Sequence, residues 1–480
     1  MKKLLICFML ITTCVVGQAS WTGEASLQGK FQISTPIFVP STFFGIHVNR
    51  TPGSPWPTIN PGGSFRSLNA TSGIGIGWAQ IELSANNTAR CPAPGTHTYD
   101  WTSADEVLGT AHAQGFDIVY TLANTPQCFA TIRNDPKCTI QSGSCDAPID
   151  INPDGSGTNA NLIAFITALT NRYPYIKYFE IWNETNIAGE WQGTDQQLVR
   201  IGQDIGSIVH PKGGQVLSAN VTGMLVGAAS RLSSFLTARA NGVTGSQVSD
   251  IISIHTYIHF KTDSTAPIPE NMPTVVKDAR AVLNSVDSAK PLWSTEYSWG
   301  DTFADNFNDP MQRSAFLARS LLLLASQNVG RVFWYGWDFN SSDGKSTSSG
   351  GLWDSVNTDS FGCANQGSSF APTGFLCTPG VAYQQVYSWL VGNSVSLCSG
   401  PALPATGIWT CSLANSKGSS MLAVWTNDPA FVCKGTCPTT TFKPDPIYTA
   451  FSTLDDSTSH TIAPGTSVKI GARPILLRTQ

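Results

Sequence analysis

The sequence predicts a (β/α)8 TIM barrel followed by a smaller antiparallel β-sandwich domain. Eight apolar β-type runs alternate with helical patterns over most of the chain. These runs are apolar throughout, as expected for parallel strands that are covered on both faces. From about Gly392 the pattern changes to short β-type runs separated by Gly, Pro and Ser clusters. The 480 residues are enough for one large domain and one small one.

The eight expected barrel strands follow one another in chain order, with helical segments between them. They are Phe43–Val48, Gly63–Leu68, Asp117–Leu122, Tyr178–Trp182, Val216–Val221, Ile251–Ile258, Pro291–Thr295 and Arg331–Trp337. Apolar residues recur at helical spacing in Leu162–Leu169 and Leu198–Ile208. Asp309 and Pro310 form a cap and first-turn pair for a helix through Leu324, and the eighth helix is expected at Ala382–Val391.

Long insertions rich in Gly, Ser and Asn follow three of these strands. They span Asn69–Pro94, Asn124–Thr158 and Phe339–Pro379. Because each insertion follows a strand and precedes a helix, it belongs to the face of a barrel that carries functional sites.

The domain boundaries follow from these patterns. We expect the barrel over residues 43–391 and the β-sandwich over residues 392–480. Residues 20–42 form an N-terminal segment in which Ser20–Pro36 is a candidate extra strand of the β domain. The five expected strands of that domain are Ile408–Leu413, Met421–Thr426, Ile447–Phe451, Ser467–Ile470 and Pro474–Leu477.

The first 19 residues have the features of a secretory signal peptide. Lys2 and Lys3 precede an apolar run from Leu4 to Val16, and Gly17-Gln18-Ala19 supplies small residues for cleavage. The run is too short for a membrane span, and no later stretch resembles one. The sequence therefore predicts a secreted or periplasmic protein.

The cysteine count supports export. Ten of the 12 cysteines remain after the signal peptide, and an even number in an exported chain favours disulfides over metal ligation. Local pairs are expected between Cys363 and Cys377, Cys398 and Cys411, and Cys433 and Cys437. The remaining four leave three pairings open: Cys91, Cys128, Cys138 and Cys145.

Composition excludes several classes of function. The net charge is −4, only 12% of residues are charged, and no basic stripe occurs, so nucleic acid is not an expected partner. The sequence lacks a close His pair, a Cys-x-x-C pair, an Asp-rich calcium loop, a working phosphate loop and a Gly-x-Ser-x-Gly elbow. We therefore expect neither a metal nor a cofactor.

The fourth strand ends in an amide and a carboxylate, Asn183 and Glu184. Residues of equal parity share a face of a strand, so Glu184 is expected at the tip and Glu180 deeper. Glu184 is the candidate general acid/base, and Asn183 is a candidate donor to a sugar 2-hydroxyl. The alternative is a solvated loop glutamate, which the position at the end of a barrel strand disfavours.

Glu296 ends the seventh strand, three strands after Glu184, and is the candidate nucleophile. Cleavage of a glycosidic bond with retention needs two carboxyl groups about 5–5.5 Å apart. The alternative is an ion pair between Glu296 and a basic residue of the rim.

Three further residues are expected around these two glutamates. His255 and Tyr257 share a face of the sixth strand, where Tyr257 could hold Glu296 ionised and His255 could contact a sugar hydroxyl. Arg66, expected at the end of the second strand, is suited to fixing the charge of the nucleophile. Each has a purely structural alternative, as a polar filler or an ion pair.

The remaining candidates bind sugar in the expected cleft. Trp337 at the tip of the eighth strand is the candidate stacking platform, whereas Trp334 is expected to pack behind the barrel. His47 and Asn49 after the first strand, and Asn124 after the third, are candidates for hydroxyl recognition.

Together these motifs resemble the clan A glycoside hydrolases, and Phe179–Asn186 looks most like the acid/base motif of family 39. Phe44–His47, Ile81-Glu82 and Tyr99–Trp101 also resemble stretches of such enzymes. The resemblance departs at Thr185, where the family has proline, and at Ser67–Ala70, where a bulkier aromatic residue and an acid are usual.

The resemblance implies Glu184 as acid/base, Glu296 as nucleophile and a β-sandwich packed on the barrel. The predicted function is a secreted retaining β-glycosidase that hydrolyses O-glycosidic bonds of poly- or oligosaccharides without a cofactor. An exo-acting β-xylosidase-type enzyme, a transglycosylase and a non-enzymatic carbohydrate-binding envelope protein are the alternatives. Carbohydrate is the expected partner, and the oligomeric state is left open.

Overall fold

The computed structural model describes residues 37–479, except 49–62, 71–75, 86–95, 224–226, 259–267, 287, 300–308, 338–350 and 355–374. The expected signal peptide, the expected strand in Ser20–Pro36, Asn49, Cys91 and Cys363 lie outside the described residues. Residues from Val39 onward form one compact unit.

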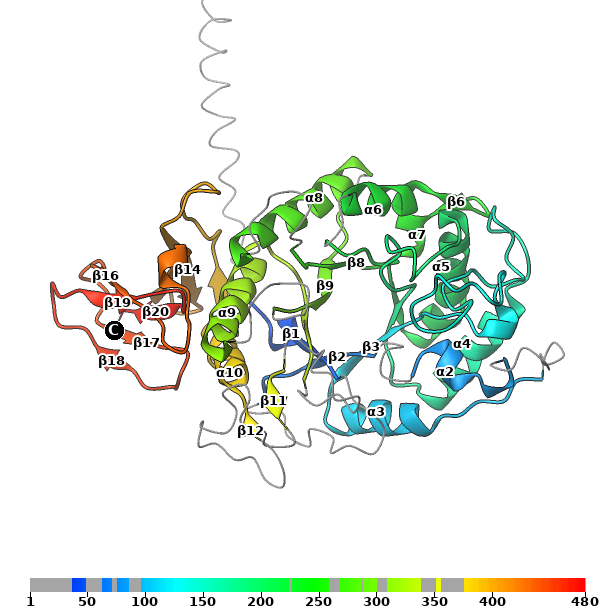
Figure 1. The fold of residues 1–480 in the computed structure, drawn as a ribbon, viewed down its shortest axis with the longest axis horizontal. Helices are drawn as coiled ribbons and strands as arrows, with labels where there is room; N and C mark the ends of the chain where they lie inside the picture. The colour runs from blue at the N-terminus through cyan, green and yellow to red at the C-terminus, as the bar shows by residue number, and fades with distance from the viewer. Residues whose placement is uncertain are drawn as a thin grey trace, which may run out of the picture. The chain divides into compact units, whose positions relative to one another are not determined.

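Eight parallel strands form the centre of this unit (Figure 1). They are β1 (Phe44–His47), β2 (Ser67–Ala70), β3 (Asp117–Thr121), β4 (Tyr178–Glu180), β5 (Gln215–Leu217), β8 (Ile252–His255), β9 (Leu292–Tyr297) and β10 (Val332–Tyr335). Their order is β5-β4-β3-β2-β1-β10-β9-β8. Parallel bridges from Leu217 to Ile251 and from Thr222 to His255 close the ring between β5 and β8. The predicted (β/α)8 barrel is confirmed.

The helices surround the ring of strands (Figure 1). They are α2 (Trp78–Ile81), α3 (Thr102–Ala113), α4 (Ala160–Arg172), α5 (Asp195–Val209), α6 (Ala228–Thr237), α7 (Gly245–Val248), α8 (Met272–Ser285), α9 (Pro310–Ser326) and α10 (Thr378–Leu390). Asp309 caps α9 as predicted, because its Oδ1 accepts the amides of Met311 and Gln312 at 2.8 and 3.1 Å. Among the described residues, no helix has the length and apolar character to cross a membrane.

Short elements complete the connections. The 3-10 turns are η1 (Ser41–Phe43), η4 (Leu83–Ala85), η6 (Gln127–Phe129), η7 (His210–Lys212), η8 (Pro269–Asn271) and η9 (Pro429–Phe431). Two small hairpins pair β6 (Arg239–Ala240) with β7 (Val243–Thr244) and β11 (Trp353–Asp354) with β12 (Phe375–Leu376).

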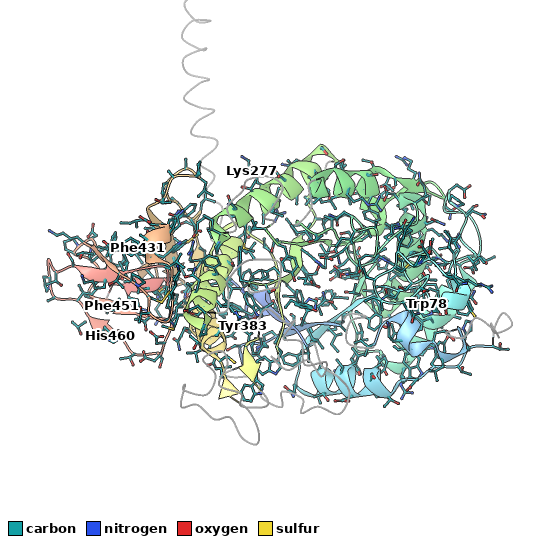
Figure 2. All side chains as sticks on the ribbon, viewed as in Figure 1. Trp78, Lys277, Tyr383, Phe431, Phe451 and His460 are labelled. Carbon is teal, nitrogen blue, oxygen red and sulfur yellow. A yellow bond between two sulfur atoms is a disulfide. The ribbon has the colours of Figure 1, made fainter. Side chains whose placement is uncertain are left out.

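The C-terminal part is an antiparallel β-sandwich, as predicted. Its six-stranded sheet contains β13 (Asn393–Val395), β14 (Ile408–Asn415), β15 (Ser420–Thr426), β20 (Ile475–Arg478), β17 (Ala450–Ser452) and β18 (His460–Thr461). The second sheet pairs β16 (Thr440–Phe442) with β19 (Val468–Ile470). Val424 and Leu477 of the first sheet share a buried apolar cluster with Val468 and Ile470 of the second. On β17 and β18, the rings of Phe451 and His460 stack at 4.9 Å (Figure 2).

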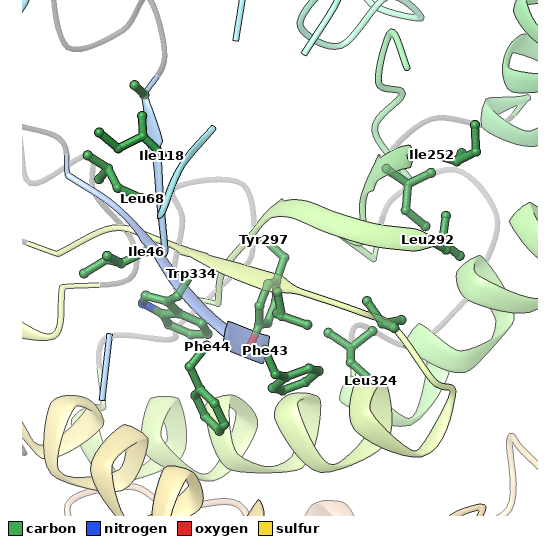
Figure 3. Close-up of a cluster of buried hydrophobic side chains, with 14 of the residues drawn as sticks. Phe43, Phe44, Ile46, Leu68, Ile118, Ile252, Leu292, Tyr297, Leu324 and Trp334 are labelled. Carbon is green, nitrogen blue, oxygen red and sulfur yellow. The ribbon is translucent and has the colours of Figure 1, made fainter. Parts of the chain in front are cut away.

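A buried layer of large side chains packs the barrel strands against the helices (Figure 3). Phe44 of β1 meets Tyr383 and Tyr387 of α10 edge to face, with ring centroids 5.3 and 5.0 Å apart. Trp334 of β10 meets Tyr297 of β9 at 5.1 Å, so it packs behind the barrel as predicted. Because side chains alternate along a strand, the neighbours of these outward residues face the interior.

The amino-terminal end of the barrel is filled by the guanidinium of Arg331. This group lies over the rings of Tyr178 and Trp293, at 4.8 and 4.6 Å, and pairs with Asp117 at 2.8 Å. It also donates to the hydroxyl of Ser67 at 2.9 Å. A filled amino-terminal end leaves the carboxyl ends of the strands as the place for a site.

Polar contacts tie the barrel to the sandwich, whereas the disulfides described with both partners each lie within one of the two. The buried carboxylate of Glu270 accepts from Nε and Nη2 of Arg319 on α9, and from the Trp425 indole of β15 at 2.7 Å. The expected disulfides Cys398–Cys411 and Cys433–Cys437 are present. Of the four cysteines left open, Cys138 pairs with Cys145. Cys128 and Cys377 are also disulfide-bonded.

Candidate active site

Two glutamates from strands far apart in the sequence converge at the carboxyl end of the barrel. One carboxylate oxygen of Glu184, one of Glu296 and Nδ1 of His255 all lie within 4.8 Å of one another. The two glutamate side chains are 14% and 15% exposed, so both remain accessible. This separation suits direct attack on a sugar, whereas inverting enzymes hold their carboxyl groups about 6.5–9.5 Å apart.

The backbone of Glu184 is left-handed, with φ of 37°. For a residue with a side chain, this conformation costs about 1–2 kcal/mol. The amide of Glu184 donates to Oδ1 of Asn220 at 2.6 Å. Asn186 exchanges two 2.9 Å hydrogen bonds with the backbone of Thr222. The loop that carries Glu184 is thus fixed to the segment following β5.

Glu296 lies in β9, surrounded by groups that act on its charge. Tyr257 donates its hydroxyl to Oε1 at 2.9 Å, which is the hydrogen bond expected from the sequence. Burial raises the pKa of Glu296 to about 7, while the charge of His255 and the Tyr257 hydroxyl lower it. Burial also raises the pKa of Tyr257 well above its ordinary value, so this hydroxyl keeps its proton.

His255 lies between the two carboxylates. Its Nδ1 is 2.8 Å from Oε1 of Glu184 and 4.0 Å from Oε2 of Glu296. Burial lowers the pKa of His255, but the two glutamates outweigh burial and raise it to about 9. The sequence suggested a contact with a sugar hydroxyl. The structure instead makes His255 a cation shared by the two acids.

A second layer of polar residues lies under this site. The fully buried carboxylate of Glu180 accepts from the hydroxyls of Thr121 and Thr295, at 2.7 and 2.8 Å. The carbonyl of Thr295 accepts from Nε2 of His47 at 2.6 Å and from Nδ2 of Asn69 at 2.9 Å. These bonds fix the β9 backbone next to Glu296.

His47 was expected to bind a sugar hydroxyl, and the structure gives it a different contact. Burial lowers the pKa of His47 to about 3, so the imidazole is neutral and its Nε2 proton is committed to the Thr295 carbonyl. Its Nε2 lies 4.0 Å from Oε2 of Glu296, so His47 lies next to the nucleophile on the buried side of the site.

The expected role of Trp337 as an open stacking platform is wrong. Its side chain is 1% exposed, its ring stacks on Trp353 at 5.6 Å, and its edge meets Phe65 at 4.9 Å. The strand ends at Tyr335, two residues earlier than expected. Tyr335 is partly exposed, shares the inward parity of Phe333 and lies 5.3 Å from the His47 ring. Tyr335 is therefore a partly exposed aromatic residue at the mouth.

The expected position of Arg66 is also wrong. The second strand is Ser67–Ala70 and not Gly63–Leu68, so Arg66 precedes the strand. Ser67 and Asn69 face the barrel interior, where they contact Arg331 and Thr295, so Arg66 faces the opposite way. Arg66 thus lies at the amino-terminal end and cannot fix the charge of Glu296.

The two remaining candidates lie near the mouth. Asn183 is partly exposed next to Glu184, and its side chain stabilises the charged form of Glu190. Asn124 is buried three residues after β3, with a left-handed φ of 64° and a side-chain nitrogen that has no hydrogen-bond partner. Both positions agree with a role in binding hydroxyl groups.

Sequence reasoning missed Asn220, Asn69, Thr295 and Tyr335. Asn220 had a usable signal, because it is a polar residue just beyond a buried strand, like Asn124. Within the described residues, a second acidic group gathers Asp135 and Asp146 around Cys138 and Cys145. These cysteines are joined in a disulfide, so they supply no thiolate for a metal.

No protein-family model matches the sequence, and no curated protein sequence matches it. Solved structures share its fold. A glucosidase from Croceicoccus marinus superposes with a TM-score of 0.56 at 12% identity, covering 93% of this chain and 97% of the other. A GH39 enzyme from Xanthomonas axonopodis pv. citri gives 0.55 at 15% identity, covering 93% and 96%.

A third match is the catalytic domain of GH30 xylanase C from Talaromyces cellulolyticus. It gives a TM-score of 0.52 at 14% identity, covering 93% of this chain and 99% of the other. The chain therefore has the barrel-and-sandwich fold of family 39 and family 30 glycosidases. The resemblance to clan A drawn from the sequence motifs is confirmed at the level of the fold.

Proposed function

We propose that this protein is a secreted retaining β-glycosidase that hydrolyses O-glycosidic bonds of poly- or oligosaccharides. One observation carries the proposal: oxygens of Glu184 and Glu296 lie within 4.8 Å of each other and of a ring nitrogen of His255. Solved structures with this fold include a glucosidase and a xylanase, which supports a sugar as substrate.

The reaction proceeds in two displacements. Glu296 attacks the anomeric carbon while Glu184 donates its proton to the leaving oxygen, so the glycosidic bond breaks and a glycosyl ester forms on Glu296. Glu184, now ionised, takes a proton from water. The resulting hydroxide attacks the same carbon, breaks the ester and restores both carboxyl groups. Two inversions give net retention.

The neighbouring residues assist the charge changes. Tyr257 and His255 stabilise the ionised form of Glu296, both as nucleophile and as leaving group of the second step. Asn183 is proposed to donate to the sugar 2-hydroxyl, a bond that strengthens as the ring becomes an oxocarbenium ion. Tyr335 is proposed as the surface on which the sugar ring stacks.

Export is part of the proposal. The N-terminal sequence has the features of a signal peptide, and disulfides such as Cys138–Cys145 persist in oxidising compartments. The exo-acting β-xylosidase-type and transglycosylase alternatives use the same residues. Product analysis with and without an acceptor sugar separates them from hydrolysis within a polysaccharide.

The test is a screen of nitrophenyl glycosides and of plant and bacterial polysaccharides. On any substrate that the wild type cleaves, Glu184→Ala and Glu296→Ala are expected to lose about 10²–10⁴-fold in kcat. Glu106→Ala on α3, in the outer ring of helices, is the matched control and should keep wild-type turnover. Wild-type turnover in either active-site variant would refute the assigned roles. A folded wild type that binds sugar without cleaving any would support the binding-protein alternative.

A further inference from the structure

Asn220 is a fully buried residue that contacts three consecutive peptides around Glu184. Its amide donates to the Trp182 carbonyl at 3.1 Å. Its carbonyl accepts from the Thr185 amide at 3.0 Å and from the Thr185 hydroxyl at 3.1 Å. Its side-chain oxygen accepts from the Glu184 amide at 2.6 Å. The backbone bonds need no particular side chain, whereas the last bond requires an acceptor at this position.

That last bond acts on a strained peptide. Glu184 has a φ of 37°, which residues with a side chain seldom adopt unless their surroundings fix it. A single backbone hydrogen bond is comparable in strength to this strain. Loss of the acceptor would therefore let the peptide relax toward negative φ. The Cα–Cβ bond of Glu184 would turn with it, and the carboxyl would leave its contact with His255.

The same segment also positions the partner of Glu184. The residue after Asn220, Val221, accepts the His255 amide through its carbonyl at 2.9 Å. Thr222 forms a parallel β-bridge with His255, and its carbonyl accepts a hydrogen bond from the side-chain amide of Asn186. Residues 220–222 thus hold both sides of the 2.8 Å contact between Glu184 and His255.

We propose that Asn220 is a positioning residue that holds the acid/base carboxyl of Glu184 in register with the leaving oxygen, an inference that rests on the proposed function. Asn220 does not touch substrate in this account. It acts through the backbone of Glu184, and its side-chain oxygen is the required feature.

Leaving-group dependence tests this role. Dinitrophenolate leaves a glycoside without being protonated. The phenol or alcohol of a phenyl or alkyl glycoside leaves only when a general acid protonates its oxygen. Asn220→Ala is expected to lower kcat/KM about 10–100-fold for the phenyl glycoside, with little change for the dinitrophenyl glycoside. Glu184→Ala should show the same selectivity with a larger loss. A merely structural defect would lower kcat/KM for both substrates by the same factor.

Two further variants and one control complete the design. Asn220→Ser has a side chain too short to reach the Glu184 amide, so it should repeat the alanine result, and it replaces alanine if that variant does not fold. Asn220→Asp keeps an acceptor oxygen, so its kcat/KM for the phenyl glycoside should be close to that of the wild type. Asn393→Ala removes a buried amide bonded to the Trp389 carbonyl at 2.7 Å, far from the site, and should leave both substrates unaffected.

The outcomes separate the two proposals. If the wild type cleaves no glycoside, or if Glu184→Ala shows no selectivity, the proposed function fails and the role of Asn220 fails with it. If Glu184→Ala is selective while folded Asn220→Ala or Asn220→Ser loses equally on both substrates, the function stands and this inference is overturned. An aspartate variant no better than alanine also overturns it.

Discussion

Nδ1 of His255 lies 2.8 Å from Oε1 of Glu184, and the same nitrogen lies 4.0 Å from Glu296. One imidazolium therefore serves two carboxylates that would otherwise repel each other. Because the pKa of His255 is raised to about 9, this charge is present at neutral pH.

His255→Ala should remove the attraction that lowers the pKa of Glu296. Fewer molecules would then carry an ionised nucleophile, so the acid limb of kcat/KM should move to higher pH. Activity at pH 6 should fall about 10–100-fold, because the lost charge attraction is comparable to about 1.5–3 kcal/mol. The measurement is the pH profile of kcat/KM for His255→Ala, with His112→Ala on α3 as the control. An acid limb unchanged in the His255 variant would contradict the shared-cation account.

The wild-type pH profile follows from the same groups. The nucleophile must be ionised, and burial raises the pKa of Glu296 to about 7. We therefore expect kcat/KM to rise as pH increases through about 7 and to fall above about 9, where His255 loses its proton. Initial rates from pH 4 to 10 on one aryl glycoside give the profile. Full activity at pH 5 would show that Glu296 is ionised well below the expected range.

Folding stability should depend on pH in the opposite sense. The pKa of Glu296 is about 7 in the folded protein and near 4.5 when unfolded, so the folded state holds more protons between these values. Its unfolding free energy should therefore fall as pH rises from about 4.5 to 7. The raised pKa of His255 contributes stability that is complete below 6.5 and is lost as pH rises through about 9.

Glu296→Gln tests this linkage. The variant buries no charge at position 296, so we expect its Tm at pH 8 to exceed that of the wild type by about 2–4 °C. Its decline in stability between pH 4.5 and 7 should also be weaker. Thermal melts across this range, with Glu106→Gln as the control, give the answer. A Tm at pH 8 equal to or below that of the wild type would mean that burying the ionised carboxylate carries no net penalty.

The Glu270–Arg319 pair lies within the barrel beneath the Trp425 indole of the sandwich, and it should matter for stability alone. Arg319→Met leaves a buried carboxylate without its cation, which costs about 3–5 kcal/mol. The pair of Arg172 with Asp105 is 44% and 46% exposed, so Arg172→Met should cost about 1 kcal/mol or less. Denaturant unfolding compares the two. An equal loss of unfolding free energy in the two variants would indicate that the charge of Glu270 is neutralised or solvated without Arg319.

Much of the fold was predictable because barrel strands are apolar runs. The prediction was wrong at β2, since its inward residues Ser67 and Asn69 are polar and bond to Arg331 and Thr295. That polar pattern hides a strand and shifted its expected bounds onto Arg66. Trp337 was misassigned because a strand end read from sequence is uncertain by about two residues, and Tyr335 shows where β10 actually ends.

The convergence of Glu184 and Glu296 was predictable because each lies at or just beyond the carboxyl end of a barrel strand, and such ends meet on one face. The contacts of His255, Asn220 and Glu180 were not. They join residues 36 to 115 positions apart, and no local pattern says which polar groups will meet across a barrel. Only the three-dimensional arrangement pairs them.

The account depends on one covalent event, the formation of a sugar ester on Glu296. The most direct measurement is the mass of peptides after incubation with an activated 2-fluoro analogue of a sugar that the enzyme cleaves, since slow release of that ester lets it accumulate. We predict one added fluoroglycosyl group on the peptide containing Glu296, and none in Glu296→Gln. Attachment to any other residue would contradict the account.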